Sequence, residues 1–112
     1  MIKKIAVIGT GVIGTGWIIR CLAHNFKVTA YDRDPKLKKK IIQEIRRASP
    51  FVKKLFKKKK INLKNFKYVT SLEAALKDAD FIQENATENY KIKTNLMSFI
   101  GKYAKNNAII SS

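Results

Sequence analysis

Hydrophobic and polar positions follow two periods along this chain. Short apolar runs rich in β-branched residues, each bounded by polar residues or glycine, predict buried strands at residues 4–8, 27–31, 66–70, 79–83 and 108–110. Between them, apolar residues recur at every third or fourth position, as on one face of a helix. This pattern predicts helices at residues 12–23, from about 35 to 48, shortly after Ser71, and at 89–104.

One segment interrupts this regular alternation. Ser49 and Pro50 predict the end of a helix, because proline lacks a backbone N–H and its ring clashes with the preceding turn. The very basic residues 51–60 are then expected to form a second helix or an irregular excursion. The apolar face of that helix would consist of Val52, Leu55 and Phe56.

A glycine motif joins the first strand to the first helix. Gly9 permits a tight turn out of the strand, and Gly11, which has no Cβ, lets a pyrophosphate approach the backbone. Gly14 lets the helix pack closely on the sheet. The N–H groups at the start of the helix carry partial positive charge and suit the phosphates. The motif therefore predicts a phosphate-binding turn.

An acid follows at the end of the second strand. Asp32 lies close to the spacing of about 20 residues at which a carboxylate accepts a hydrogen bond from the ribose 2′-OH of a dinucleotide. Its charge would repel a 2′-phosphate, which favours NAD over NADP. The neighbouring Arg33 leaves the NADP alternative open, since an arginine can accommodate that phosphate.

Together these features predict an α/β fold, a Rossmann-type doubly wound parallel sheet with the strand order 3-2-1-4-5. NAD would lie across the carboxyl ends of the strands, at the switch point between the first and fourth. On topology alone, residues 84–88 must then lie near the cofactor. A glycine-rich turn in some other α/β domain is the alternative.

Charge raises a different possibility. The 112 residues suffice for one domain, and they include 24 Lys and Arg against 8 Asp and Glu, for a formal net charge of +16. Clustered lysines can neutralise nucleic-acid phosphates. We do not favour a nucleic-acid partner, because the basic runs contain no aromatic platform, and Phe51 and Phe56 have the spacing of a buried helix side. The lysines would then be solvated surface residues, or would steer an acidic ligand.

No signal peptide or transmembrane segment is expected, because glycines and Arg20 interrupt the only long apolar stretch. Cys21 is the only cysteine, so it cannot form an intramolecular disulfide. A reduced, cytoplasmic location fits.

Three sequence blocks carry a resemblance to a known family. Residues 9–17 (GTGVIGTGW), 79–84 (ADFIQE) and 88–93 (ENYKIK), together with Tyr31-Asp32, resemble the 3-hydroxyacyl-CoA dehydrogenase family. The likeness covers essentially the whole chain as that family's NAD-binding domain. It implies oxidation of a 3-hydroxyl group with NAD in a larger enzyme whose substrate is of the carnitine, gulonate or 3-hydroxybutyryl-CoA type.

The resemblance also implies roles for particular residues. Val12 and Ile13 match the pyrophosphate turn, and Asp32 matches the acid at the adenosine ribose. Glu88 matches a glutamate on the nicotinamide side of the cofactor, and Lys93 matches a lysine that contacts NAD. From the residues alone, a solvated helix start at Glu88 and Lys93 remains the alternative.

No catalytic residue and no metal site is expected within these 112 residues. The family's histidine base and its substrate-binding residues lie beyond the fifth strand, in a part that includes a helical domain for catalysis and dimerisation. We therefore expect an N-terminal fragment of a two-domain enzyme, inactive alone and a homodimer when complete. His24 is expected to cap or pack the end of the first helix. The alternative function is a stand-alone, non-catalytic NAD- or nucleotide-binding module.

Overall fold

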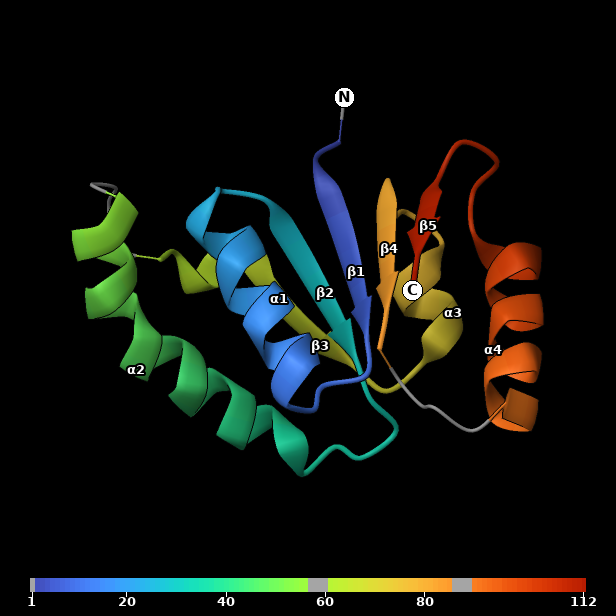
Figure 1. Ribbon diagram of the computed structural model, residues 1–112, viewed down its shortest axis with the longest axis horizontal. Coiled ribbons are helices and arrows are strands. Elements are labelled where there is room, and N and C mark those ends of the chain that lie inside the picture. The colour runs from blue at the N-terminus through green and yellow to red at the C-terminus, as the bar shows by residue number, and fades with distance from the viewer. Residues whose placement is uncertain (1, 57–60, 86–89) are drawn as a thin grey trace.

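A parallel sheet forms the centre of the computed structural model, which describes residues 2–56, 61–85 and 90–112. The strands are β1 (Lys4–Ile8), β2 (Lys27–Tyr31), β3 (Phe66–Val69), β4 (Phe81–Glu84) and β5 (Ile109–Ser111). They lie in the order β3-β2-β1-β4-β5, and every neighbouring pair is parallel (Figure 1). The predicted fold class and strand order are confirmed.

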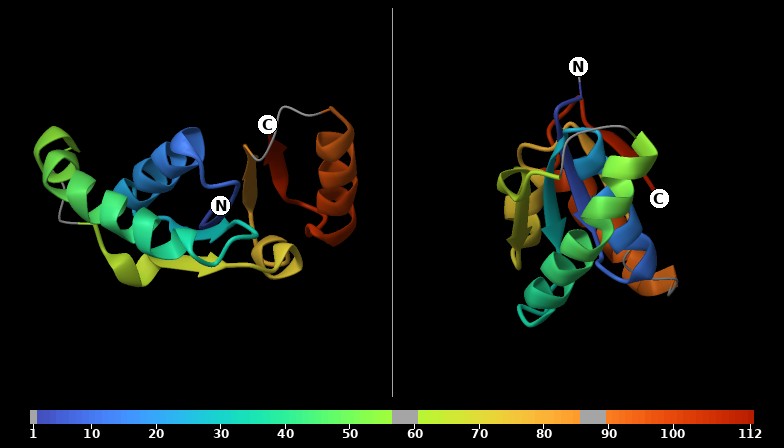
Figure 2. Two further views of the ribbon diagram at one scale, coloured as in Figure 1. Left: turned by 90° about the horizontal axis from the view of Figure 1, so that it is seen from below. Right: turned by 90° about the vertical axis from the view of Figure 1, so that its left-hand side faces the viewer.

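Helices connect successive strands. They are α1 (Val12–Ala23), α2 (Leu37–Phe56), α3 (Leu72–Leu76) and α4 (Tyr90–Tyr103), and the 3₁₀ helix η1 (Leu63–Asn65) precedes β3. The views of Figure 2 place α1 and α3 on opposite sides of the sheet. Within the described residues, no helix is long and apolar enough to cross a membrane.

Two hydrophobic cores sandwich the sheet. Ile5 and Val7 of β1 pack with α1 and α2, whereas Ala6 and Ile8 of the same strand pack with α3 and α4. Successive residues of a strand point to opposite faces, so a strand covered on both faces reads as an uninterrupted apolar run. That is why residues 5–8 are all buried, with at most 6% exposure.

The predicted helix break at Ser49 and Pro50 is wrong, because α2 continues through Pro50. Ile45 and Val52 lie on either side of the proline and are both buried in the core with α1. The Ser49 hydroxyl, itself buried, accepts a hydrogen bond from the Ile61 backbone N–H at 3.3 Å. These contacts hold the helix together despite a cost of about 3 kcal/mol for an internal proline.

The expected apolar face of residues 51–60 is only partly present. Val52 is 7% exposed, but Leu55 is 77% and Phe51 67% exposed. The end of α2 projects past the edge strand β3 (Figure 1). The side chain of Phe56 and residues 57–60 lie outside the described part.

Element ends differ slightly from the prediction. β4 begins at Phe81 rather than at residue 79, and it includes Glu84, which the sequence placed just after the strand. β5 begins one residue late, at Ile109. Asp34 accepts a hydrogen bond from the Lys36 N–H at 2.9 Å, so the residues before Leu37 form a capping turn rather than the first helical turn.

Asp80 ties the amino ends of the central strands together. Its Oδ2 accepts hydrogen bonds from the backbone N–H groups of Lys3 and Lys4, both at 2.9 Å, and its Oδ1 is paired with the Lys105 ammonium. These contacts, that of Lys105 foremost, hold the pKa of Asp80 well below its ordinary value. One carboxylate therefore links β1, the start of β4 and the loop before β5.

We predict that Asp80→Asn lowers the midpoint of urea unfolding at neutral pH. A carboxylate whose pKa is lower in the folded chain stabilises fully above its unfolded pKa of about 4 and loses that effect as the pH falls through the folded pKa. The difference between variant and wild type should thus shrink below about pH 4. Asp78→Asn, an exposed site on the same turn, is the control. Equal effects of the two substitutions would contradict the proposed role of Asp80 in linking the amino ends of the strands.

Candidate functional site

The glycine turn depends on two glycines for different reasons. Gly9 has φ 92°, a conformation that L side chains rarely adopt, and its N–H donates to the Tyr31 carbonyl at 2.9 Å. A Cβ on Gly14 would lie 1.9 Å from the Gly9 carbonyl oxygen. The start of α1 therefore approaches the end of β1 so closely that only a glycine fits at position 14, as the sequence predicts.

The N-terminus of α1 is open to a ligand. Gly11 caps the helix without any side-chain hydrogen bond, and the first turn contains no acid. A Cβ on Gly11 would meet no atom within 4 Å. Val12 is 93% exposed and Ile13 70%, which is unusual for large apolar side chains. Uncapped N–H groups with partial positive charge suit a phosphate here.

Asp32 is held beside this turn by Thr10. The Thr10 hydroxyl donates to Asp32 Oδ2 at 2.8 Å, and the Thr10 N–H donates to the same oxygen at 3.3 Å. Asp32 Oδ1 accepts from the Asp34 N–H at 3.4 Å. The carboxylate thus has a fixed position at the carboxyl end of β2. Sequence reasoning missed Thr10, whose hydroxyl at a variable position of the glycine turn was the available signal.

A hollow of about 620 Å³ lies next to Asp32, between α1 and α2. Its lining includes Thr10, Gly11, Thr15, Asp32, Leu37 and Ile41. The hydroxyl of Tyr68 donates to the Asp34 carbonyl, which braces the loop that follows Asp32. Burial, and then the charge of Asp32, raise the pKa of Tyr68 and keep it a donor. The hollow has the size and polarity to accept part of a nucleotide.

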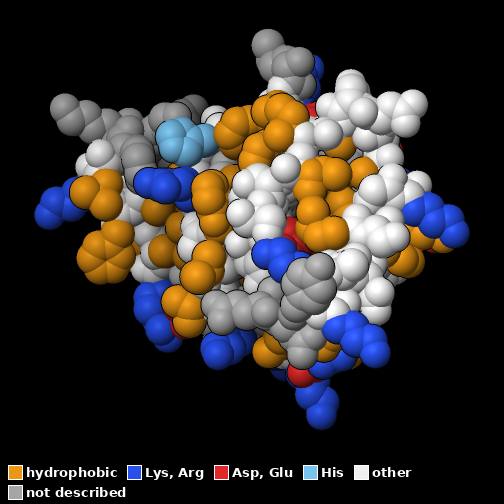
Figure 3. Space-filling model, turned by 45° about the vertical axis from the view of Figure 1, so that its right-hand side comes forward, with side chains coloured by type: hydrophobic (Ala, Val, Ile, Leu, Met, Phe, Trp, Pro, Cys, Tyr) orange, Lys and Arg blue, Asp and Glu red, His pale blue; other side chains and the backbone are white. Residues whose placement is uncertain are grey.

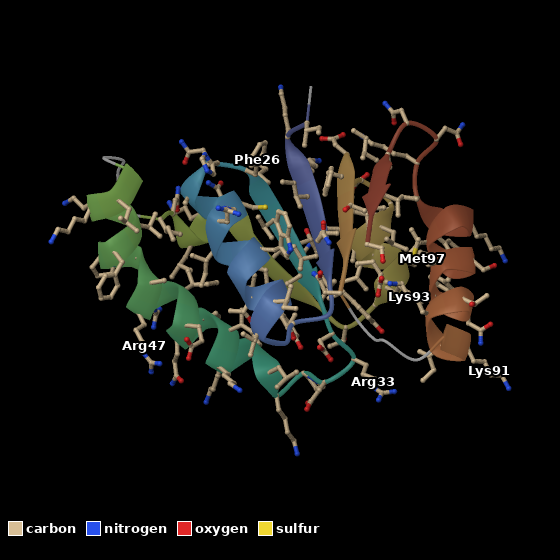
Figure 4. All side chains as sticks on the ribbon, viewed as in Figure 1. Phe26, Arg33, Arg47, Lys91, Lys93 and Met97 are labelled. Atoms are coloured by element: carbon tan, nitrogen blue, oxygen red, sulfur yellow. The ribbon has the colours of Figure 1, made fainter. Side chains whose placement is uncertain are left out.

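The carboxyl end of β4 holds a second fixed carboxylate. Glu84 is 2% exposed, and its Oε2 lies 3.4 Å from Lys93 Nζ. The Ser112 hydroxyl donates to the same oxygen at 3.1 Å. Figure 4 shows Lys93 on the sheet side of α4 and Lys91 on its outer side. Sequence reasoning placed Glu84 near the cofactor on topology but gave it no role of its own, although an acid at the last position of a buried strand was a signal.

The predicted site residues therefore fall into two groups. Gly9, Gly11, Val12, Ile13, Gly14 and Asp32 meet at the ends of β1 and β2. Lys93 lies at the end of β4, paired with Glu84. Glu88 lies outside the described residues. Arg33 is exposed and extends away from the turn (Figure 4).

His24 lies at the other end of α1, about 18 Å from the glycine turn along the helix axis, and Cys21 lies about one helical turn before it. The His24 backbone N–H donates to the carbonyls of Arg20 and Cys21, which confirms its predicted place at the helix end. Burial raises the pKa of the Cys21 thiol. In the part of the chain that the structure describes, no cluster of three or more metal-ligating side chains occurs.

Known proteins share both sequence and fold with this chain. The family profile described as 3-hydroxyacyl-CoA dehydrogenase, NAD binding domain, matches residues 4–112. The chain is 44% identical over 110 residues to L-carnitine dehydrogenase of Oceanobacillus iheyensis. This match covers 98% of the chain and 36% of that protein. The chain is also 38% identical over 109 residues to L-carnitine dehydrogenase of Staphylococcus epidermidis. That match covers 97% of the chain and 34% of the relative.

Among solved structures, 3-hydroxybutyryl-CoA dehydrogenase from Escherichia coli has the same fold, with a TM-score of 0.86 at 24% identity. The match covers 98% of this chain and 24% of that one. The chain thus spans about a third of the length of the curated relatives it matches.

We predict opposite effects of alanine at two glycines of α1. Gly14→Ala places a Cβ against the Gly9 carbonyl and should destabilise the chain by about 1–3 kcal/mol, the usual cost of overpacking. Gly16→Ala meets nothing within 4 Å and should stabilise it by up to about 1 kcal/mol, because alanine is the better helix former. Chemical unfolding measures both; equal effects would refute the close approach at Gly14.

Proposed function

Because this chain belongs to the 3-hydroxyacyl-CoA dehydrogenase family, as its NAD-binding domain, we propose that it holds NAD for hydride transfer in an NAD-dependent dehydrogenase. One observation carries the proposal: the uncapped N-terminus of α1 lies beside a carboxylate fixed by the same turn. A phosphate and an adjacent ribose hydroxyl have partners at that place.

The residues present fit NAD. The N–H groups of Val12 and Ile13 at the start of α1 would bind the pyrophosphate, and Asp32 would accept a hydrogen bond from the adenosine ribose 2′-OH. The cofactor would also cover the exposed Val12 and Ile13 side chains. Because Thr10 holds Asp32 in place, a 2′-phosphate would meet a fixed negative charge. This arrangement favours NAD over NADP.

The other half of the cofactor would extend over β4. By resemblance, Glu88 and Lys93 would contact it there, and Lys93 points to this end of the sheet (Figure 4). Bound NAD would supply the hydride acceptor. The chain's own residues would bind it and fix its orientation.

For the whole protein we propose oxidation of the 3-hydroxyl of a small 3-hydroxy acid, with L-carnitine as first candidate. The proposal rests on the identity with L-carnitine dehydrogenases. A cytoplasmic enzyme and a homodimer are further parts of it. In support, hydrophobic side chains gather on the face shown in Figure 3. Trp17 of α1 is 36% exposed and Ile109 of β5 is 51% exposed. Such surface suits further packing partners.

We predict that Asp32→Ala weakens NAD binding by about tenfold to a hundredfold, because a hydrogen bond to a charged group is worth about 1.5–3 kcal/mol. Fluorescence of the single tryptophan, Trp17, or calorimetry measures the affinity. The same substitution should lower the ratio of the NAD affinity to the NADP affinity, because the fixed negative charge is removed. Asp78→Ala, at the opposite end of the sheet, is the control, and an unchanged NAD affinity of Asp32→Ala would refute the assignment.

Gly11→Val separates binding from folding in the same titration. Its Cβ would meet no atom of the chain, and its φ of −68° is ordinary, so the fold should persist. The added bulk should block the pyrophosphate. Normal NAD affinity in this variant would refute docking at the glycine turn.

We further predict that the complete protein forms NADH when given NAD and L-carnitine, whereas residues 1–112 alone bind NAD without turnover. Spectroscopic detection of NADH checks both. NADH formation with a 3-hydroxyacyl-CoA and none with L-carnitine would contradict L-carnitine as the substrate and favour the acyl-CoA. A complete protein that binds NAD but oxidises no 3-hydroxy compound would favour a non-catalytic nucleotide-binding module.

A further inference from the structure

The amino ends of three strands carry polar side chains on a face that is apolar further along. Ala6 of β1, Tyr31 of β2 and Val69 of β3 pack in the core that includes α3. Because side chains alternate along a strand, the residues two or four positions earlier lie on the same face of the sheet. Those residues are Lys4, Lys27, Thr29 and Lys67. The face that α3 covers thus changes from apolar to basic toward the amino ends of the strands.

Two of these lysines are direct neighbours in the sheet. The register of β1 and β2 pairs Lys4 with Lys27, and that of β2 and β3 pairs Thr29 with Lys67. Like charges directly opposite each other on neighbouring strands are destabilising, and lysine is uncommon in strands. In the part of the chain that the structure describes, none of the three ammonium groups forms an ion pair. Their mutual repulsion therefore favours an anion supplied from outside the chain.

A hollow of about 380 Å³ lies over this basic face. The five residues of α3 extend only about 7 Å, whereas the five of β1 extend about 16 Å, so the helix covers only part of the face. The hollow is lined by five lysines and one acid, namely Lys4, Lys27, Lys64, Lys67, Lys77 and Asp78. Positive charge around a hollow of this size suits a small, multiply charged anion.

This hollow is separate from the glycine turn. Lys4 and Lys27 are the first residues of β1 and β2, whereas Gly9 and Asp32 follow the last residues of the same strands. Gly9 lies about 16 Å from Lys4 along β1. In addition, α1 and α3 lie on opposite sides of the sheet (Figure 2). An anion in the hollow would therefore leave the glycine turn free.

We propose that this hollow is a separate anion site that binds a small polyphosphate. Lys27 and Lys67, on neighbouring strands, donate to phosphate oxygens, and the Thr29 hydroxyl between them donates a further hydrogen bond. The other three lysines add positive charge around the ligand. Because Asp78 repels anions, a single charge gains little, and a chain of phosphates that contacts several lysines gains most.

The probe is inorganic tripolyphosphate, titrated into the 112-residue chain at about 0.15 M salt and saturating NAD. Amide NMR spectra locate the anion residue by residue, so the hollow and the glycine turn are read separately even if NAD does not bind. We expect the largest shift changes at residues 27, 29 and 67, with saturation at one anion per chain.

Two substitutions remove a charge from the hollow and keep the length of the side chain. Lys27→Met and Lys67→Met should each weaken tripolyphosphate binding by about threefold to fivefold, the upper range for an exposed ion pair, and the double variant by about tenfold or more. Without the anion, Lys27→Met should unfold at the same or a higher temperature, because its repulsion with Lys4 is removed. That measurement shows that weaker binding does not result from unfolding.

Lys38→Met and Lys54→Met are the matched controls, because both lysines are exposed on α2 and carry the same charge. Each should change the affinity less than about twofold, since salt screens charges more than about 8 Å away.

Saturable shift changes at residues 27, 29 and 67 that weaken in Lys27→Met and Lys67→Met, but not in the controls, support the site. No binding, equal losses in the controls, or shift changes spread over α2 overturn it. Duplex DNA that binds the same residues more tightly than tripolyphosphate also overturns it, in favour of a nucleic-acid surface. None of these results bears on the proposed NAD site, which residues 10–14 report.

Discussion

The close approach of α1 to the end of β1 is the constraint on which the site depends. At Gly14 the helix comes so near the Gly9 carbonyl that a Cβ would lie 1.9 Å from the oxygen. This contact fixes the direction of α1, and therefore where its uncapped N–H groups point. It also places Thr10 beside β2, within hydrogen-bond distance of Asp32. The same short turn thus sets both the packing of α1 and the positions of the groups that we propose bind the cofactor.

Two carboxylates mark the two halves of the crevice, and each is restrained differently. Asp32 is bound by the hydroxyl and N–H of Thr10, and it keeps partial exposure at the end of β2. Glu84 is covered at the end of β4, where Lys93 neutralises it. An exposed carboxylate can accept a hydrogen bond from a ligand, whereas a covered one can only orient its neighbour. The difference in burial therefore supports a direct contact with the ligand for Asp32 in the function we propose, and contacts within the chain, such as that with Lys93, for Glu84.

Much of this architecture could be predicted from the sequence, because the patterns are local. The apolar run at residues 4–8, the glycine turn and Asp32 lie within one βαβ unit, and strand alternation supplies the order of the sheet. The continuation of α2 through Pro50 could not, since it depends on Ser49 and Val52 meeting distant parts of the chain. The pairing of Glu84 with Lys93 and the contact of Thr10 with Asp32 likewise join residues whose proximity only the folded sheet creates. Glu88 lies outside the described residues, and its role remains a prediction.

The central claim is that NAD lies across the carboxyl ends of β1, β2 and β4 with its pyrophosphate at α1. Amide NMR spectra of the chain, recorded during titration with NAD, test it most directly. The account predicts that the largest shift changes fall on residues 10–14, Asp32 and Asn85, with little change at Asp78 and Asp80 at the opposite end of the sheet. Changes confined to that opposite end, or none at saturating NAD, would contradict it.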